Sequence, residues 1–252
     1  MTLVLLHGFL GLPESWSEVA LALGPGERVL RPALLGHGAG DWDTLPASFE
    51  GEIDRLAKVL RIERCSRVHL VGYSMGARVA LVLAATHPDL VSRLTLVSGS
   101  AGLDDDDERR ARAIADSHLA DTLRQDGLPS FVRRWEALPL FATQQRLPPG
   151  ARARHRARRL SHRAPLVAHA LEVLSPGRMP AMTKRLAEID VPVSLVAGSL
   201  DAKFTAIARA IAPLFPRARA LVLEGAGHDP CLERPHELAA LLFDNTLMEI
   251  AP

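Results

Sequence analysis

The chain has 252 residues, 48% of them hydrophobic, and a formal net charge of +1. This length and composition suffice for one large domain with a full core, or for one domain with an insertion. A net charge near zero excludes a global attraction to nucleic acid or to an anionic membrane, and an aromatic content of 4% is low for a base-stacking surface. We therefore expect neither nucleic acid nor a membrane as a partner.

Short apolar runs alternate along the chain with segments of helical period. The predicted strands are Thr2–Leu6, Arg28–Arg31, Arg67–Val71, Leu94–Val97, Val193–Ala197 and Ala220–Leu223. The predicted helices are Trp16–Leu23, Phe49–Leu60, Gly76–Thr86, Phe204–Leu214 and His236–Met248. The strands are nearly continuously apolar, as parallel strands covered on both faces are. This alternation predicts an α/β fold, a mostly parallel sheet with helices on both faces.

The apolar run Thr2–Leu6 follows Met1 without a basic region, and it is too short to cross a bilayer. Cys65 and Cys231 lie far apart, with no C-x-x-C spacing between them, which indicates ordinary thiols in a reducing compartment. We expect a cytoplasmic enzyme.

Residues 102–189 interrupt the alternation, because they contain no convincing strand. The acidic run Asp104–Asp107 could begin a helix, where negative charge suits the helix dipole. A second helical stretch is dense in arginine, with Arg152, Arg154, Arg156, Arg158 and Arg159. We predict that residues 102–189 form a helical lid segment over a core made of residues 1–101 and 190–252.

A serine lies at the bend between a predicted strand and a predicted helix, in the run Gly72-Tyr73-Ser74-Met75-Gly76. G-x-S-x-G between a strand and a helix is the pattern of a nucleophile elbow. The flanking glycines avoid collisions in a strained turn that exposes the serine hydroxyl. The context, more than the short motif, makes Ser74 a candidate nucleophile or base.

An acid and a histidine follow two later strands, Asp201 after Val193–Ala197 and His228 after Ala220–Leu223. Either residue alone would be read as a turn residue. Residues beyond the carboxyl ends of parallel strands converge on one crevice, however, and the order serine, acid, histidine is that of the hydrolase triad. We predict that Ser74, Asp201 and His228 form a catalytic triad. The other histidines show no metal-ligand spacing, and we assign no metal.

The loop after the first strand, His7-Gly8-Phe9-Leu10-Gly11, is a candidate oxyanion loop. An oxyanion hole needs two preorganised backbone N–H groups. We predict that Phe9 supplies one and that Met75, which follows the serine, supplies the other.

Together these residues resemble the α/β-hydrolase superfamily over the whole chain. The resemblance rests on His7-Gly8-Phe9, Gly36-His37-Gly38, Gly72 to Gly76, Asp201 and Gly227-His228. Similar proteins usually carry an antiparallel hairpin before the first strand, and we expect that hairpin to be missing here. Arg78, Lys203-Phe204, Glu108 to Arg112 and Trp135 to Phe141 are similar to a narrower family, the 2-succinyl-6-hydroxy-2,4-cyclohexadiene-1-carboxylate synthases of menaquinone biosynthesis.

Arg78 independently indicates an anionic substrate. A permanent cation on the first turn of the elbow helix departs from the apolar pockets of esterases, and guanidinium matches carboxylate bidentately. Arg112, Arg159 and Lys203 could add positive charge, and Tyr73 could donate a hydrogen bond. Trp135 is left open between a pocket wall and the lid core. A solvated surface position is the alternative for the lid arginines.

The resemblance implies a lyase that expels pyruvate from a polycarboxylate cyclohexene with the triad as base, and without a cofactor. Two alternatives stay open: a carboxylesterase that acts through an acyl-serine, and a non-catalytic small-molecule receptor on the same fold. The sequence gives no indication of oligomeric state.

Overall fold

The computed structural model describes residues 2–38 and 44–243. In this part of the chain, six strands form one sheet in the order β2-β1-β3-β4-β5-β6. They are β1 (Thr2–Leu6), β2 (Arg28–Leu30), β3 (Val68–Tyr73), β4 (Val91–Val97), β5 (Val193–Gly198) and β6 (Ala218–Leu223). Neighbouring strands pair in parallel throughout. The predicted fold class is confirmed, and no antiparallel strand joins the sheet within the described residues.

Helices connect the strands: the described ones include all five that the sequence predicts, and others lie in the lid segment and just before the last helix. They are α1 (Ser17–Leu23), α2 (Phe49–Ile62), α3 (Met75–Thr86), α4 (Asp106–Glu136), α5 (Pro149–Leu160), α6 (Ala164–Val173), α7 (Ala202–Ile211), α8 (Pro230–Glu233) and α9 (Pro235–Phe243). Ser48 caps α2 by accepting a hydrogen bond from the Gly51 amide at 3.0 Å. The predicted continuation of the last helix to Met248 lies outside the described residues.

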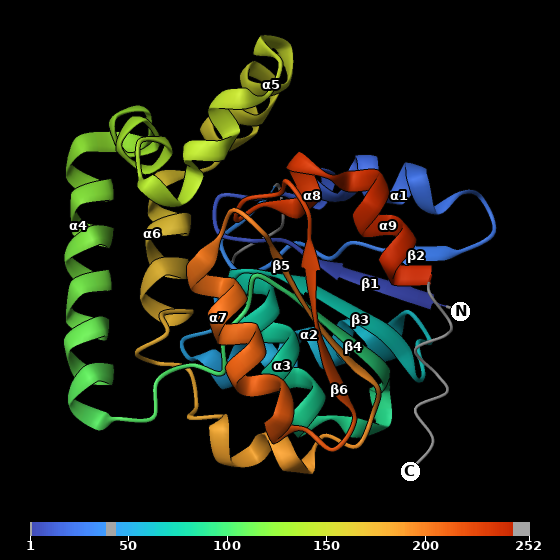
Figure 1. The fold of residues 1–252 in the computed structure, drawn as a ribbon. Coiled ribbons are helices and arrows are strands. Elements are labelled where there is room, and N and C mark those ends of the chain that lie inside the picture. The colour runs from blue at the N-terminus through green and yellow to red at the C-terminus, as the bar shows by residue number, and fades with distance from the viewer. Residues whose placement is uncertain (1, 39–43, 244–252) are drawn as a thin grey trace.

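The helices cover the sheet on both faces (Figure 1). Side chains of β1 alternate between two buried clusters, as the period of a strand requires. Val4 and Leu6 pack in the cluster that contains α2, α3 and part of α7. Leu3 and Leu5 pack in the cluster that contains α1, α8 and α9. The core is therefore two layers of helix on one sheet, and it fixes where the strands end.

The lid segment contains only helical regular structure, and α4 and α6 lie side by side in it (Figure 1). Asp105 caps α4 by accepting from the amides of Asp107 and Glu108, each at 2.9 Å. Gly127 interrupts α4 with a non-helical conformation of φ 74° and ψ 164°, two residues before Pro129. The lid has its own small core, which also holds Leu10 from the loop after β1. This contact ties the lid to the loop that follows β1.

No helix within the described residues combines the length and the apolar character that crossing a membrane requires.

Candidate active site

Ser74 lies in a strained turn between β3 and α3, with φ 52° and ψ −109°. Its own amide donates to the Val97 carbonyl at 2.9 Å, which anchors the turn to β4. A side chain on Gly72 would collide with the backbone of Gly76, and one on Gly76 would collide with the carbonyls that end β1. Only glycine fits at these two positions, because the elbow brings strand and helix backbones into contact. The local sequence thus dictates the predicted elbow.

The structure brings the three predicted triad residues into hydrogen-bonding distance. The His228 Nε2 atom lies 3.1 Å from the Ser74 Oγ atom, and the His228 Nδ1 atom lies 2.7 Å from the Asp201 Oδ2 atom. A carboxylate can only accept, so Nδ1–H donates to Asp201 and Nε2 accepts from the serine hydroxyl. This is the arrangement in which an imidazole removes a proton from serine.

His228 is enclosed by aromatic rings. The ring centroid of Phe204 lies 4.5 Å from that of His228, and those of Tyr73 and Phe141 lie at 5.6 and 6.0 Å. The imidazole is only 2% exposed. Exclusion of water strengthens its hydrogen bonds to Ser74 and Asp201.

Burial, together with nearby Glu233, also raises the pKa of the adjacent Asp229 carboxyl to about 6.

The loop after β1 lies beside Ser74, and Phe9 and Met75 both line the cavity that contains the serine. Leu10 adopts a positive φ of 56° and donates its amide hydrogen bond to the His37 Nε2 atom at 3.1 Å. His37 is fully buried, which lowers its pKa well below the usual value, so Nε2 is free to accept. His37 therefore holds the conformation of the predicted oxyanion loop, while the donor roles of Phe9 and Met75 stay predictions.

A cavity of about 500 Å³ opens on Ser74 and His228. Most of the predicted substrate residues line it: Arg78, Arg112, Trp135 and Lys203. The Arg78 Nη1 atom donates to the Leu174 carbonyl at 2.6 Å, which fixes the guanidinium against the lid. Burial, and then the neighbouring Arg112, lower the pKa of Arg78 to about 10, so the group remains charged at neutral pH.

Tyr73 and Arg159 line a smaller pocket of about 30 Å³ that also reaches Ser74. Arg159 is 4% exposed and donates to Glu136 at 3.1 Å and to Gln144 at 3.3 Å. The structure thus puts Arg159 near the serine, but with protein partners already in place. Arg159 is therefore not the solvated surface residue of the alternative interpretation, whereas the Arg112 side chain lines the cavity but is still 48% exposed.

Trp135 does both things that the sequence left open. It lines the cavity, and it packs in the lid against Phe131 and Phe141. Its ring also lies 5.1 Å from that of Phe9, centroid to centroid. Trp135 therefore connects the lid to the candidate oxyanion loop.

The profile of the alpha/beta hydrolase family matches residues 3–241. The chain belongs to the α/β-hydrolase family. Solved structures of this family agree with the fold: the structure of MenH from S. aureus is 32% identical, has a TM-score of 0.91, and aligns over 96% of this chain and 91% of its own. A thermophilic esterase from Thermogutta terrifontis is 25% identical with a TM-score of 0.83, over 96% of this chain and 88% of its own.

Relatives within the α/β-hydrolase family carry the narrower name that the sequence resembles. A Bacillus subtilis (strain 168) protein, provisionally named as a 2-succinyl-6-hydroxy-2,4-cyclohexadiene-1-carboxylate synthase, is 38% identical over 92% of this chain and 85% of its own length. The synthase of that name from Enterobacter sp. (strain 638) is 32% identical over 95% of this chain and 89% of its own. The predicted resemblance to this group is confirmed.

One charged residue of this α/β-hydrolase site was given no role in the site by sequence reasoning. Asp116 is 5% exposed, lines the cavity, and accepts from Arg112 Nε at 2.9 Å and from Ser175 Oγ at 2.6 Å. Asp116 follows Arg112 by four residues on a helix, so the i, i+4 spacing was the signal that could have found it. Asp116 orients Arg112 toward the cavity and offsets part of the positive charge there.

The site can therefore carry out proton transfer or nucleophilic attack by serine beside an anion-binding wall. No group of three His, Cys, Asp or Glu side chains in residues 2–38 and 44–243 gathers closely enough to hold a metal ion.

Proposed function

We propose that the chain is a carbon–oxygen lyase of menaquinone biosynthesis. It eliminates pyruvate from 2-succinyl-5-enolpyruvyl-6-hydroxy-3-cyclohexene-1-carboxylate and leaves 2-succinyl-6-hydroxy-2,4-cyclohexadiene-1-carboxylate. The synthase relatives support this reaction. The observation that carries it is the cation-lined cavity, since Arg78 and Arg112 line the same 500 Å³ space as Ser74 and His228.

The triad acts as a base in this proposal. The Ser74 oxygen, whose proton passes to His228, removes the ring proton from the carbon that bears the succinyl group. The C–H electrons form a double bond in the ring, the existing double bond shifts by one position, and the bond to the enolpyruvyl oxygen breaks. The proton held by His228 then neutralises the departing enolpyruvate, which becomes pyruvate. No water is consumed, and no covalent intermediate on the serine is required.

Negative charge develops on the succinyl carbonyl oxygen when the proton leaves. The amides of Phe9 and Met75 are our candidates to bind this oxygen. One such donor is worth about 3–4 kcal/mol in acyl-transfer enzymes. The same two amides would serve this enolate, because the charge appears on a carbonyl oxygen in both reactions.

The substrate carries three carboxylates, which explains the charge of the cavity wall. Arg78, Arg112 and Lys203 supply cations there, and Asp116 supplies a carboxylate. Bidentate contacts from guanidinium fix both position and orientation, and orientation of the ring toward the base contributes to the rate.

The test is to generate the unstable substrate in situ with the preceding enzyme and to follow pyruvate and the diene absorbance together. We expect pyruvate and diene to appear in equal amounts. Pyruvate release no faster than the spontaneous rate, with folded protein present, would contradict the proposal.

The rival function is a carboxylesterase that acts through an acyl-serine. Its support is the triad itself, together with the 25% identical esterase structure. Short-chain nitrophenyl esters separate the two functions. We expect ester turnover to be slow relative to pyruvate release, because a neutral acyl group brings no carboxylate to pair with the cations of the cavity. Fast ester hydrolysis with no lyase activity would favour the esterase.

A further inference from the structure

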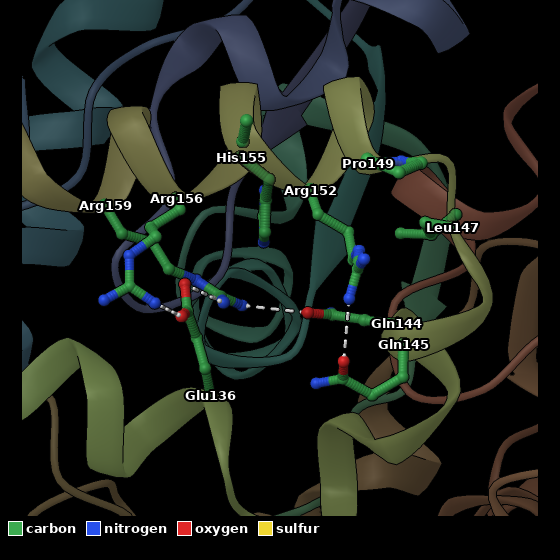
Figure 2. A pocket seen from close by; sticks show the side chains of 10 residues that line it. Glu136, Gln144, Gln145, Leu147, Pro149, Arg152, His155, Arg156 and Arg159 are labelled. Carbon is green, nitrogen blue, oxygen red and sulfur yellow. Dashed lines mark hydrogen bonds and ion pairs between the residues drawn. The ribbon is translucent and has the colours of Figure 1, made fainter.

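A second cavity, of about 290 Å³, lies between α5 and the 3₁₀ helix Pro139–Arg146. Figure 2 shows side chains of α5 pointing into this cavity toward Glu136, Gln144 and Gln145. The residues of α5 that line it include Arg152, His155, Arg156 and Arg159. Their spacing of three and four residues puts them on one face of the helix, so this face is a row of cations around one histidine.

This outer cavity has more positive than negative charge. Arg156 and Arg159 share one carboxylate, that of Glu136, at 2.6 and 3.1 Å. Arg152 has a neutral partner, the Gln145 Oε1 atom at 2.9 Å. Burial lowers the pKa of His155 to about 3, with help from Arg159 and Arg158, so the imidazole adds no charge at neutral pH. Among the lining side chains, guanidinium groups exceed carboxylates.

Unpartnered polar atoms also line the cavity. Gln144 is 7% exposed, and its Oε1 atom accepts from Arg159. Its Nε2 atom is buried and has no hydrogen-bond partner in the described part of the chain, and the same holds for the His155 Nε2 atom. Buried polar atoms are nearly always paired in folded proteins, so an unpaired amide N–H in a cationic cavity indicates an acceptor that comes from outside the chain.

The outer cavity adjoins the active site. Arg159 and His155 line both the outer cavity and the small pocket that reaches Ser74. Exposure falls steadily along the row, since Arg152 is exposed, the Arg156 side chain is 42% exposed and the Arg159 side chain is 5% exposed. The cations therefore lead from the protein surface inward to the serine.

We propose that the outer cavity is a binding site for a small carboxylate anion, held by Arg152, Arg156 and the Gln144 amide. Two sources share this chemistry under the proposed function: the released α-keto acid, and a carboxylate arm of the incoming substrate. The site itself rests on the geometry above, and only the source of its ligand rests on the proposed function.

The test is calorimetric titration with pyruvate and, separately, with succinate, in the Ser74→Ala protein at low ionic strength. We expect the double substitution Arg152→Gln and Arg156→Gln to weaken the binding of at least one anion by about tenfold for each guanidinium removed. Arg154→Gln is the matched control, because Arg154 is exposed on the same helix and does not line the cavity. Its affinity should equal that of the parent protein.

Gln144→Glu provides an independent variant, since it puts a carboxylate where we expect the ligand's own. It should give a comparable loss of anion affinity. In the Ser74→Ala parent protein, tighter binding of pyruvate than of succinate would identify the released acid as the ligand. Tighter binding of succinate than of pyruvate would identify the substrate arm. Unchanged affinity for both anions in the double variant and in Gln144→Glu would overturn the site. Because no turnover is measured, a chain without lyase activity could still confirm it.

Discussion

Asp201 has two tasks at the end of β5. It caps α7 through the Phe204 amide at 3.2 Å, and it holds the His228 Nδ1 atom at 2.7 Å. The cap fixes the carboxylate, and the carboxylate fixes the tautomer that leaves Nε2 free for Ser74. A substitution of Asp201 that keeps the cap should therefore affect the reaction more than the fold.

We expect Asp201→Asn to lower kcat by a factor on the order of 10³–10⁴, because an amide no longer enforces the correct imidazole tautomer. An asparagine oxygen can still cap α7, so the far-UV circular dichroism and the melting temperature should change little. Asp190→Asn, at an exposed position, is the matched control. A near-normal kcat in Asp201→Asn would remove the triad from the mechanism.

Arg78 binds the substrate in our account, and Arg78→Ala should lower kcat/KM about 10- to 100-fold, the value of one or two hydrogen bonds to a charged group. The fold should persist, since the partner of Arg78 is one lid carbonyl. Arg209→Ala, on the exposed face of α7, should behave as the unaltered protein. Wild-type kinetics in Arg78→Ala would contradict the proposed binding of a substrate carboxylate by Arg78.

Sequence reasoning found the residues that strand ends bring together, and it missed partnerships made across the lid. Ser74, Asp201 and His228 are separated along the chain but follow parallel strands, so topology alone predicts that they meet. Arg159 and Glu136 meet only because α4 and α5 pack together. No local pattern encodes that contact.

At the scale of elements, the loops after β1 and β2 are joined by two histidines. His7 accepts from the Leu34 amide at 3.1 Å, and His37 accepts from the Leu10 amide at 3.1 Å. Their rings lie 5.1 Å apart, centroid to centroid. Each loop therefore supports the conformation of the other, and the candidate oxyanion amide of Phe9 depends on both.

His37→Phe should remove the acceptor for Leu10 and let the loop relax from its positive φ. We expect kcat to fall by up to about 100-fold, since small displacements of reacting groups carry such penalties. The free energy of unfolding should fall by roughly 1–3 kcal/mol for the unpaired amide. His118→Phe, exposed on α4, is the control. A loss of stability with an unchanged kcat would show that His37 only supports the fold.

The elements themselves were predictable to within a few residues where apolar periodicity is strong. β3 and α3 appear where the elbow motif predicts them, and α2 begins at the predicted Phe49. β4 begins at Val91, three residues before the predicted start, because a short 3₁₀ turn at Pro88–Leu90 leads directly into it. The arrangement of the lid helices depends on contacts between distant segments and was outside the reach of local patterns.

For the whole molecule, the parallel sheet class followed from the sequence, but the strand order did not. β1 lies between β2 and β3, with Val4 opposite both Leu30 and Leu70. That register depends on how helices pack on each face, which no single segment specifies. The division into core and lid segment stays our proposal about how these parts act.

Buried neutral histidines should make stability depend on pH. Burial lowers the pKa of His7 to about 4 and of His69 and His155 to about 3, and it holds the pKa of His37 well below 6.5. Each binds its proton at higher pH in the unfolded chain, so stability is lost as the pH falls below about 6.5. For His7 alone, the free energy of unfolding falls by roughly 3 kcal/mol as the pH falls from 6.5 to 4.

Asp229 acts in the opposite direction, because its raised pKa stabilises the fold at low pH and that contribution is lost as the pH rises through 6. The histidines outweigh this single carboxyl. We expect urea denaturation to give a free energy of unfolding at least about 2 kcal/mol lower at pH 5 than at pH 7.5. A value that is constant or higher at pH 5 would contradict the neutral burial of these side chains.

If Ser74 is the base that expels pyruvate, replacing it with alanine removes the catalysed part of pyruvate release. Wild-type protein and Ser74→Ala are mixed with substrate formed in situ, and pyruvate is recorded continuously at equal protein concentration. We expect rapid release with the wild type and release at the spontaneous rate with Ser74→Ala, while both proteins melt at similar temperatures. Pyruvate release by Ser74→Ala at the wild-type rate would contradict it.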